Sequence, residues 1–99
     1  MIPHHLSMFY VYILRSIKNG KCYIGLSNDL NRRLEQHNAG QSYWTRRYMP
    51  FELVYYEAYR SLEDAKERER KLKHFKKGYT DLEKRLKNSL DLLSRGGGG

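Results

Sequence analysis

The side chains best suited to chemistry in this chain are two tyrosines, an arginine and a distant glutamate. Tyr12 and Tyr23 stand eleven residues apart, Arg33 follows ten residues later, and Glu69 lies much further along the chain. An arginine presents a planar fork that binds a phosphate at two points. A carboxylate can hold a hard divalent cation, and a tyrosine hydroxyl can give or take a proton. Gathered by the fold, these groups would form one phosphate-binding site.

Two antiparallel strands are expected to carry the tyrosines. Residues 9–15 and 21–27 are rich in aromatic and β-branched side chains, and an Asn-Gly pair between them is a strong hairpin signal. Successive strand residues alternate between faces, so this hairpin puts Tyr12 and Tyr23 on the same face. A two-residue turn would leave them four residues apart, roughly 13 Å at ~3.3 Å per residue. A wider loop would bring them opposite each other, so the face is predicted while the register stays open.

A glycine and a helix follow the second strand. Gly25 lies inside a strand pattern, where glycine marks a bulge or the close approach of another group. The next helix is expected from about residue 29 to residue 38, with Asn28 or Asp29 as its N-cap and Gly40 beyond its end.

The inward face of this helix carries charge. Its apolar stripe is Leu30 and Leu34, and at 100° per residue Arg33 and His37 point the same way, whereas Arg32 points outward. Burial of an unpaired Arg or His is unfavourable, so both need partners. Arg33 is therefore either a phosphate ligand or the partner of a structural carboxylate.

A second helix, starting with the capping box at Ser61, places Glu69 in a sparse apolar stripe. Over residues 62–75 the apolar side chains Leu62, Ala65 and Leu72 share one face, and Glu69 lies in its middle. A lone carboxylate there is either part of an internal salt bridge or the ligand of a cation.

Two surfaces suit a polyanion. In loop 40–50, basic and aromatic side chains alternate. Arg46 and Arg47 could bind phosphates while the aromatic rings stack on nucleobases. Alternatively, the aromatic rings simply cover the edge of the core. Lys73, Lys76 and Lys77 form a lysine run that is either a solvated face or a rim for a nucleic-acid backbone.

The remaining pattern predicts a third strand and a third helix. Residues 51–58 read as a strand in which Phe51, Leu53 and Tyr55 alternate against Val54 and Tyr56, and a capping box at Thr80 opens a further helix. The expected fold is a single α+β domain over residues 8–93, with a three-stranded antiparallel sheet flanked by about three helices. Residues 1–7 and 94–99 are expected to be flexible tails.

Composition narrows the function. Nineteen Lys and Arg against eleven acidic residues give a formal charge of +8, which favours a polyanionic partner such as nucleic acid. The single cysteine, Cys22, excludes an internal disulfide and cysteine-rich zinc modules. No apolar run reaches the ~18 residues of a membrane span and no signal-peptide pattern is present, so we expect a cytoplasmic protein.

Over about residues 9–90 these residues resemble the GIY-YIG nuclease family, and in particular its small stand-alone members related to the catalytic domain of the excision-repair nuclease subunit. Tyr10-Val11-Tyr12 stands where the family has Gly-Ile-Tyr, with Tyr10 replacing the glycine, and Tyr23-Ile24-Gly25 matches the second motif. Arg33 stands at the family's catalytic arginine, His37 follows one turn later, and Glu69 looks like the metal-binding glutamate. Asn88 is similar to an asparagine near the end of some family sites, although it falls off the helix stripe.

The resemblance implies a DNA endonuclease dependent on Mg²⁺ or Mn²⁺, acting on structured DNA in repair or recombination. Glu69 would hold a single metal ion, Arg33 would clamp the scissile phosphate, and Tyr12 or Tyr23 would activate water with help from His37. Free tyrosine has a pKa of ~10, so a nearby Arg or metal must lower it for base work.

Two other interpretations stay open. One is a non-catalytic nucleic-acid-binding module on the same scaffold. The other is a protein-interaction domain in which Arg33, His37 and Glu69 form an internal ion network. Targeting would come from loop 40–50, from a homodimer or from a protein partner.

Overall fold

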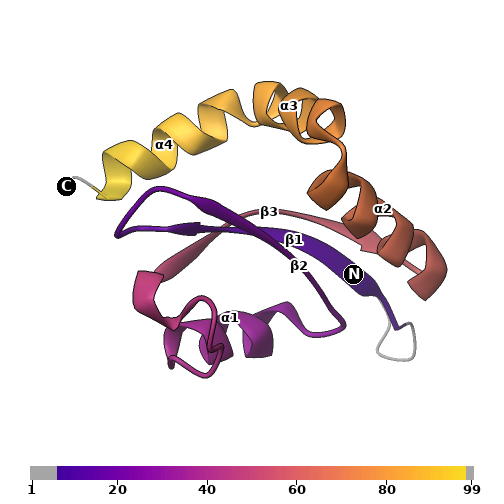
Figure 1. Cartoon of the computed structure of the whole chain (residues 1–99), viewed down its shortest axis with the longest axis horizontal. Helices are drawn as coiled ribbons and strands as arrows, with labels where there is room; N and C mark the ends of the chain where they lie inside the picture. The colour runs from indigo at the N-terminus through magenta and orange to yellow at the C-terminus, as the bar shows by residue number, and fades with distance from the viewer. Residues whose placement is uncertain (1–6, 98–99) are drawn as a thin grey trace.

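The computed structural model of the chain describes residues 7–97, in which three strands and four α helices follow one another (Figure 1). In chain order the elements are β1 (Phe9–Ser16), β2 (Cys22–Ser27), α1 (Leu30–Asn38), the 3-10 helix η1 (Arg46–Tyr48), β3 (Phe51–Tyr59), α2 (Leu62–His74), α3 (Lys76–Arg85) and α4 (Lys87–Gly97). The strands form one antiparallel sheet. The predicted α+β fold is therefore confirmed.

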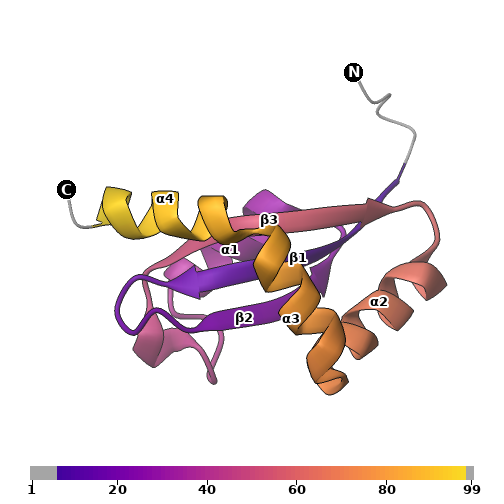
Figure 2. The same cartoon turned by 90° about the horizontal axis from the view of Figure 1, so that it is seen from above.

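Strand β1 is the centre of the sheet, with β2 on one side and β3 on the other. Its residues from Val11 to Leu14 are all buried, because helices cover both faces of the sheet. Helix α1 lies against one face, and α2, α3 and α4 lie on the other (Figure 1, Figure 2). The sheet thus separates two apolar clusters.

Each cluster draws on one alternate set of strand residues, as the period of two requires. The cluster under α2, α3 and α4 is built on Val11, Ile13, Ala65, Leu72 and Leu82. The cluster under α1 is built on Tyr12, Leu14 and Phe51, with Tyr23, Leu30 and Leu34 packed against it. Tyr12, Tyr23 and helix α1 therefore share one side of the molecule.

The β1–β2 hairpin confirms the predicted face and decides its register. Tyr12 pairs with Gly25, and Leu14 pairs with Tyr23. Residues 17–21 connect the two strands, so of the two alternatives the two-residue turn is not formed. Tyr12 and Tyr23 lie two residues apart along their common face, between the two spacings that the sequence left open.

The buried side chain of Ser16 shapes this loop. Its hydroxyl accepts hydrogen bonds from the amides of Lys18 and Asn19, each at 3.1 Å, and donates to the carbonyl of Tyr48 at 2.6 Å. Gly20 closes the loop with a φ of +75°, a conformation that glycine adopts without strain. Ser16 therefore ties the hairpin to η1, on the side of the sheet that carries α1.

Strand β3 pairs with β1 through a β-bulge. The register shifts in the middle of the pair and leaves Val54 without a partner. As a result, Phe51 and Leu53 belong to the cluster under α1, whereas Tyr55 belongs to the opposite one. The predicted alternation, which put these three residues on one face, is wrong beyond Val54. The bulge turns Glu57 toward α2.

The helix boundaries agree with the caps at α1 and α2 but not further on. The Asp29 side chain accepts from the amide of Arg32, and Ser61 caps α2 as its capping box predicts. The helix expected to open at Thr80 begins four residues earlier, at Lys76, and breaks at Leu86 into α3 and α4. Phe75, whose backbone is extended (φ −119°, ψ 106°), separates α2 from α3.

The C-terminal helix also continues further than expected. Helix α4 runs unbroken from Lys87 to Gly97, through residues 94–97 that the pattern assigned to a flexible tail. The rest of that tail, and all of the N-terminal tail except the exposed Ser7, lie outside the described residues. Within residues 7–97, none of the helices is long and apolar enough to cross a bilayer.

Candidate active site

Tyr12 is held in place by the glycine across the sheet from it. Tyr12 is only 4% exposed, and its ring lies over Gly25 so closely that a Cβ at position 25 would overlap the phenol. The close approach predicted for Gly25 is therefore made by this tyrosine. The missing side chain leaves room for the Tyr12 hydroxyl, which lies within hydrogen-bonding reach of α1.

Helix α1 aims Arg33 at this hydroxyl. The guanidinium donates from Nε to Tyr12 Oη at 3.3 Å and from Nη1 to Gln36 Oε1 at 3.1 Å. No ion pair to Arg33 occurs within residues 7–97. The alternative, in which a structural carboxylate pairs with Arg33, is thus not found among these residues. The guanidinium could therefore bind an anionic ligand. Arg32 is exposed, as predicted.

His37, one turn further on α1, contacts the same hydroxyl. It is buried, with Nε2 3.4 Å from Tyr12 Oη and Nδ1 2.8 Å from the hydroxyl of Thr45. Burial, reinforced by the neighbouring Arg33 guanidinium, lowers the pKa of His37 below its usual value of 6.5. The imidazole is therefore neutral at pH 7, with one ring nitrogen able to accept a proton.

Together these three side chains form a proton-transfer arrangement beside an open hollow. The Tyr12 oxygen contacts both a cationic donor and a neutral imidazole. A hollow of about 300 Å³ opens on the far side of this arrangement from Tyr12 and His37, which do not line it; Arg33 does, with Asn28, Asp29, Arg32 and Gln36. This space would admit a phosphate group beside the free part of the Arg33 fork.

Tyr23 lies on the same face of the sheet but outside this cluster. Its ring stacks on Tyr48 with centroids 6.1 Å apart and meets Phe51 edge-on at 5.4 Å. Tyr23 also lines a second hollow, of about 610 Å³, together with Lys73 and Lys76. Tyr23 and two residues of the lysine run therefore line the same hollow.

Glu69 lies on α2, across the sheet from α1, and the structure does not bring it into contact with Arg33. Its side chain is 22% exposed, and its carboxylate pairs with Lys73 Nζ at 3.2 Å. Ala65 and Leu72 on the same helix are buried, as the predicted stripe requires. The internal network of Arg33, His37 and Glu69 expected in one alternative is therefore not formed, and Glu69 makes a partly exposed ion pair within α2 instead.

The donor set around Glu69 is small. No group of three or more His, Cys, Asp or Glu that could enclose a metal ion occurs among residues 7–97. Mg²⁺, however, is usually held by one or two carboxylates, with water and substrate phosphates completing its shell. A single half-buried carboxylate with one lysine partner fits that kind of site and does not fit an all-protein metal cage.

The remaining predicted residues lie on the surface. Arg46 places its guanidinium 4.9 Å from the Tyr43 ring centre, and both it and Arg47 are exposed. Trp44, which precedes them in the same loop, is 81% exposed. Asn88 is exposed on α4, on the sheet face opposite α1, so the structure does not bring it to the Tyr12 cluster.

Several contributing residues had no strong signal in the sequence. Thr45 is buried between exposed neighbours and holds the His37 ring. Asn38 bonds both the amide and the carbonyl of Phe51, which closes loop 39–50 onto β3. Gln36 supports Arg33 from one turn along α1, a spacing that a search for i, i+3 partners of Arg33 would have found.

Comparisons with known proteins agree with this geometry. A family model described as the GIY-YIG catalytic domain matches residues 8–80. A UPF0213 protein from Bacillus pumilus is 35% identical over 74 residues, which is 74% of each chain. One from Streptococcus pneumoniae is 38% identical over 69 residues, or 69% of each chain.

A solved structure is similar as well. The solution NMR structure of a UPF0213 protein from Bacillus halodurans is 36% identical, covers 81% of this chain and 85% of its own, and has a TM-score of 0.50. The matched region contains both tyrosine motifs, Arg33, His37 and Glu69. The family implies a nucleic-acid substrate. With the two motifs, the arginine and the fold all in agreement, this chain belongs to the GIY-YIG nuclease family.

Proposed function

We propose that this protein is a divalent-metal-dependent endonuclease that hydrolyses phosphodiester bonds in DNA. The observation that carries the proposal is the contact of the Tyr12 hydroxyl with both the Arg33 guanidinium and the neutral His37 ring. Hydrolysis needs a group that takes a proton from water and a group that neutralises charge on the phosphoryl oxygens. This cluster supplies both beside a hollow that has room for a phosphate.

In the proposed reaction, Arg33 binds the scissile phosphate. Its Nε and Nη1 groups are oriented by Tyr12 and Gln36, which leaves the outer part of the fork for two phosphoryl oxygens. Charge develops on those oxygens in the transition state, so a donor that is already oriented stabilises it without reorganisation.

Proton removal is assigned to Tyr12 and His37. As water attacks phosphorus, its proton passes to the Tyr12 oxygen while the Tyr12 proton passes to His37 Nε2. A P–O bond forms to the water oxygen, and the P–O bond to the leaving strand breaks with its electron pair going to the leaving oxygen, which takes a proton from solvent. Thr45 holds the other ring nitrogen and so keeps Nε2 directed at the phenol. Tyr23, which is more exposed, is the alternative base.

Glu69 would hold the divalent ion, which when bound supplies charge neutralisation for phosphates of the DNA. The Glu69 carboxylate lies on α2, across the sheet from the Tyr12 cluster, so in this proposal the DNA has to reach both sides of the molecule. The net charge of +8, Arg46 and Arg47 in the aromatic loop, and the lysine run would bind the DNA backbone. We propose that the protein acts on structured DNA during repair or recombination.

The test is nicking of supercoiled plasmid in Mg²⁺, in Mn²⁺ and in EDTA. Arg33→Ala should lower the rate by ~10²-fold or more, as loss of one preorganised donor does. The matched control is Arg32→Ala, one residue away on the exposed face of the same helix. Circular dichroism of both variants checks that the fold is retained.

The outcomes separate the interpretations. Metal-dependent nicking by the parent chain that only Arg33→Ala abolishes supports the nuclease. Salt-sensitive DNA binding without any cleavage would instead identify a non-catalytic binding module. Equal losses in both variants would remove Arg33 from the phosphate site.

A further inference from the structure

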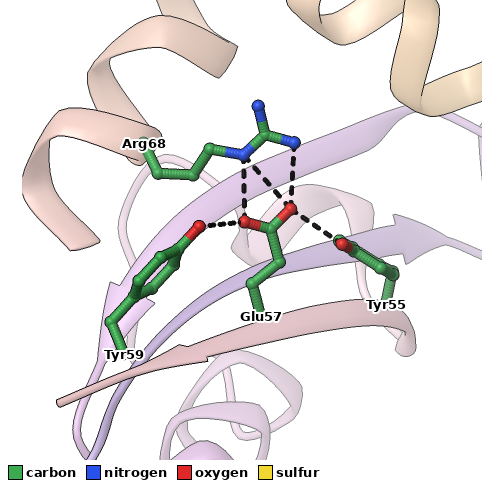
Figure 3. A network of polar contacts seen from close by, with 4 residues as sticks. All are labelled: Tyr55, Glu57, Tyr59 and Arg68. Atoms are coloured by element: carbon green, nitrogen blue, oxygen red, sulfur yellow. Dashed lines mark hydrogen bonds and ion pairs between the residues drawn. The ribbon is translucent and has the colours of Figure 1, made fainter. Parts of the chain in front are cut away.

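A second polar cluster lies on the face of the sheet that carries α2. Glu57 on β3 receives three hydrogen bonds from the guanidinium of Arg68 on α2: Nε donates to Oε1 at 2.9 Å and to Oε2 at 3.1 Å, and Nη2 donates to Oε2 at 2.9 Å. Figure 3 shows Tyr55 and Tyr59 on either side of the carboxylate, each donating its hydroxyl to one oxygen. No residue of this cluster belongs to the Tyr12 site.

The Glu57 carboxylate is fully occupied by these donors. Burial alone would raise the pKa of Glu57, but the hydrogen bonds from Arg68, Tyr59 and Tyr55 outweigh it and hold the pKa below its usual value. Burial and the bond to Glu57 raise the pKa of Tyr59 to about 12, so its hydroxyl remains a donor. With every oxygen used, Glu57 is not available to bind a metal or a substrate.

Helix α2 needs such a clamp, because its apolar contacts are few. Only Ala65 and Leu72 of its thirteen residues are buried. Arg68 and Glu69 lie between them, and the side chain of Arg68 is 27% exposed while that of Glu57 is 15% exposed. A buried ion pair adds little net stability compared with apolar packing, and its better-attested use is to select one arrangement. Here the arrangement selected is the rotation of α2 on the sheet.

We propose that Glu57 and Arg68 are positioning residues that set the rotation of α2 and thereby direct the carboxylate of Glu69 toward its metal ion. The inference rests on the proposed function, in which Glu69 holds that ion. Neighbouring residues on a helix are offset by 100°, so fixing the Arg68 side chain on β3 also fixes the direction of Glu69. Tyr55 and Tyr59 hold the Glu57 carboxylate in the orientation that accepts the two-point contact from Arg68.

The experiment compares two arginines that flank Glu69 on the same helix. Arg68→Lys keeps the charge and removes the half-buried two-point contact. Arg70→Lys makes the same change in an exposed pair, where Arg70 bonds to Glu67 and both side chains are 51% exposed. The probe is Mn²⁺ alone, titrated into ¹⁵N-labelled protein without nucleic acid, and the readout is paramagnetic broadening of amide signals around Glu69.

Arg68→Lys should weaken Mn²⁺ binding by about tenfold, the lower end of the effect of losing a supporting residue at a metal site. Arg70→Lys should leave it unchanged. In nicking assays Arg68→Lys should need more Mn²⁺ for half-maximal rate and recover the parent rate at saturating metal. A residue with only a structural role would lower the melting temperature and leave the Mn²⁺ affinity of the folded chain as it was.

Three results would overturn the inference. Parent-like Mn²⁺ affinity in folded Arg68→Lys refutes the positioning role and leaves the nuclease proposal standing. Equal weakening in Arg70→Lys shows that replacing either arginine beside Glu69 has this effect, so the contact with Glu57 is not its cause. Absence of Mn²⁺ binding near Glu69 in the parent chain refutes the metal site itself. If Arg68→Lys does not fold, Tyr59→Phe, which removes one donor and keeps the ion pair, should show a smaller loss in the same direction.

Discussion

At the scale of single residues, the candidate site depends on an absent side chain. Gly25 does not need unusual backbone angles; it is required because the Tyr12 ring occupies the space of a Cβ. The ring is pressed against β2 on one side and reaches Arg33 and His37 on the other. The second motif of the family is thus explained by packing as well as by chemistry.

Gly25→Ala should therefore displace Tyr12. Overpacking of this kind costs about 1–3 kcal/mol of stability, and the displaced hydroxyl should lower the nicking rate. The control is Gly78→Ala in α3, where a Cβ would meet only the Lys71 carbonyl at an ordinary 3.9 Å. Alanine at that helical position should stabilise by up to ~1 kcal/mol. Urea unfolding measures both, and a Gly25→Ala variant as stable and as active as the parent would contradict the packing argument.

His37 should make stability depend on pH. Its pKa lies below 6.5 in the folded chain, so between the two values the unfolded chain binds more protons. The free energy of unfolding should therefore rise with pH across this window and reach its full value above pH 6.5. Melting curves taken just below pH 6.5, above the range where carboxylates titrate, should show this slope.

The slope should disappear in His37→Gln and persist in His74→Gln, because His74 is exposed on α2. A parent chain whose melting temperature stays constant over this window would show that His37 is not protected from protonation. The same protection keeps the ring neutral for the proposed proton transfer.

At the scale of elements, the local sequence pattern predicts which face a side chain points to better than it predicts the register between strands. The common face of Tyr12 and Tyr23 and the inward direction of Arg33 follow from the periods of two and 3.6 residues. The hairpin register does not follow, because Ser16 fixes the loop through the carbonyl of Tyr48, 32 residues away. Such a contact exists only in the folded chain.

The same limit applies to β3 and to the helices after it. The bulge at Val54 leaves no mark in the alternation of apolar residues, yet it decides that Glu57 faces α2. A hint was present: Glu57 is a carboxylate in a strand of aromatic residues, as Glu69 is in an apolar stripe. The break between α2 and α3 at Phe75 could not be predicted either, because neither Gly nor Pro stands at that position.

The lysine run should account for part of the salt dependence of DNA binding. Each phosphate contact lowers the log–log slope by about 0.9, so neutralising Lys73, Lys76 and Lys77 together should reduce the slope by about two to three units. The lower figure is favoured because Lys73 already pairs with Glu69. Neutralising the exposed Lys66, Lys84 and Lys87 instead gives the same change in net charge. An unchanged slope in the first variant would identify the run as a solvated face.

At the scale of the whole molecule, the sheet separates two tasks. The face under α1 carries the Tyr12 cluster, and the face under α2, α3 and α4 carries the larger core and the Glu57 clamp. Glu69 belongs to the second layer, and its only ion-pair partner within residues 7–97 is the partly exposed Lys73. Stability and catalysis should therefore respond differently to its loss.

Glu69→Gln should abolish metal-dependent nicking because the amide lacks the negative charge that a hard cation requires. The melting temperature should stay within a few degrees of the parent value, since a pair of this exposure contributes about 0–1 kcal/mol. DNA affinity in EDTA should be equal or higher, since one repelling charge is gone. A large fall in melting temperature, or nicking at the parent rate, would refute Glu69 as the metal ligand.

The single tryptophan of the chain lies where a built-in optical probe would be most useful. Trp44 is largely in solvent, yet the next residue, Thr45, is buried and bonded to His37. Emission from Trp44 therefore reports on a loop that is mechanically connected to the proposed proton acceptor. DNA binding at this loop and protonation of His37 should each change the fluorescence of the unlabelled protein, with no engineered dye and no second tryptophan to subtract.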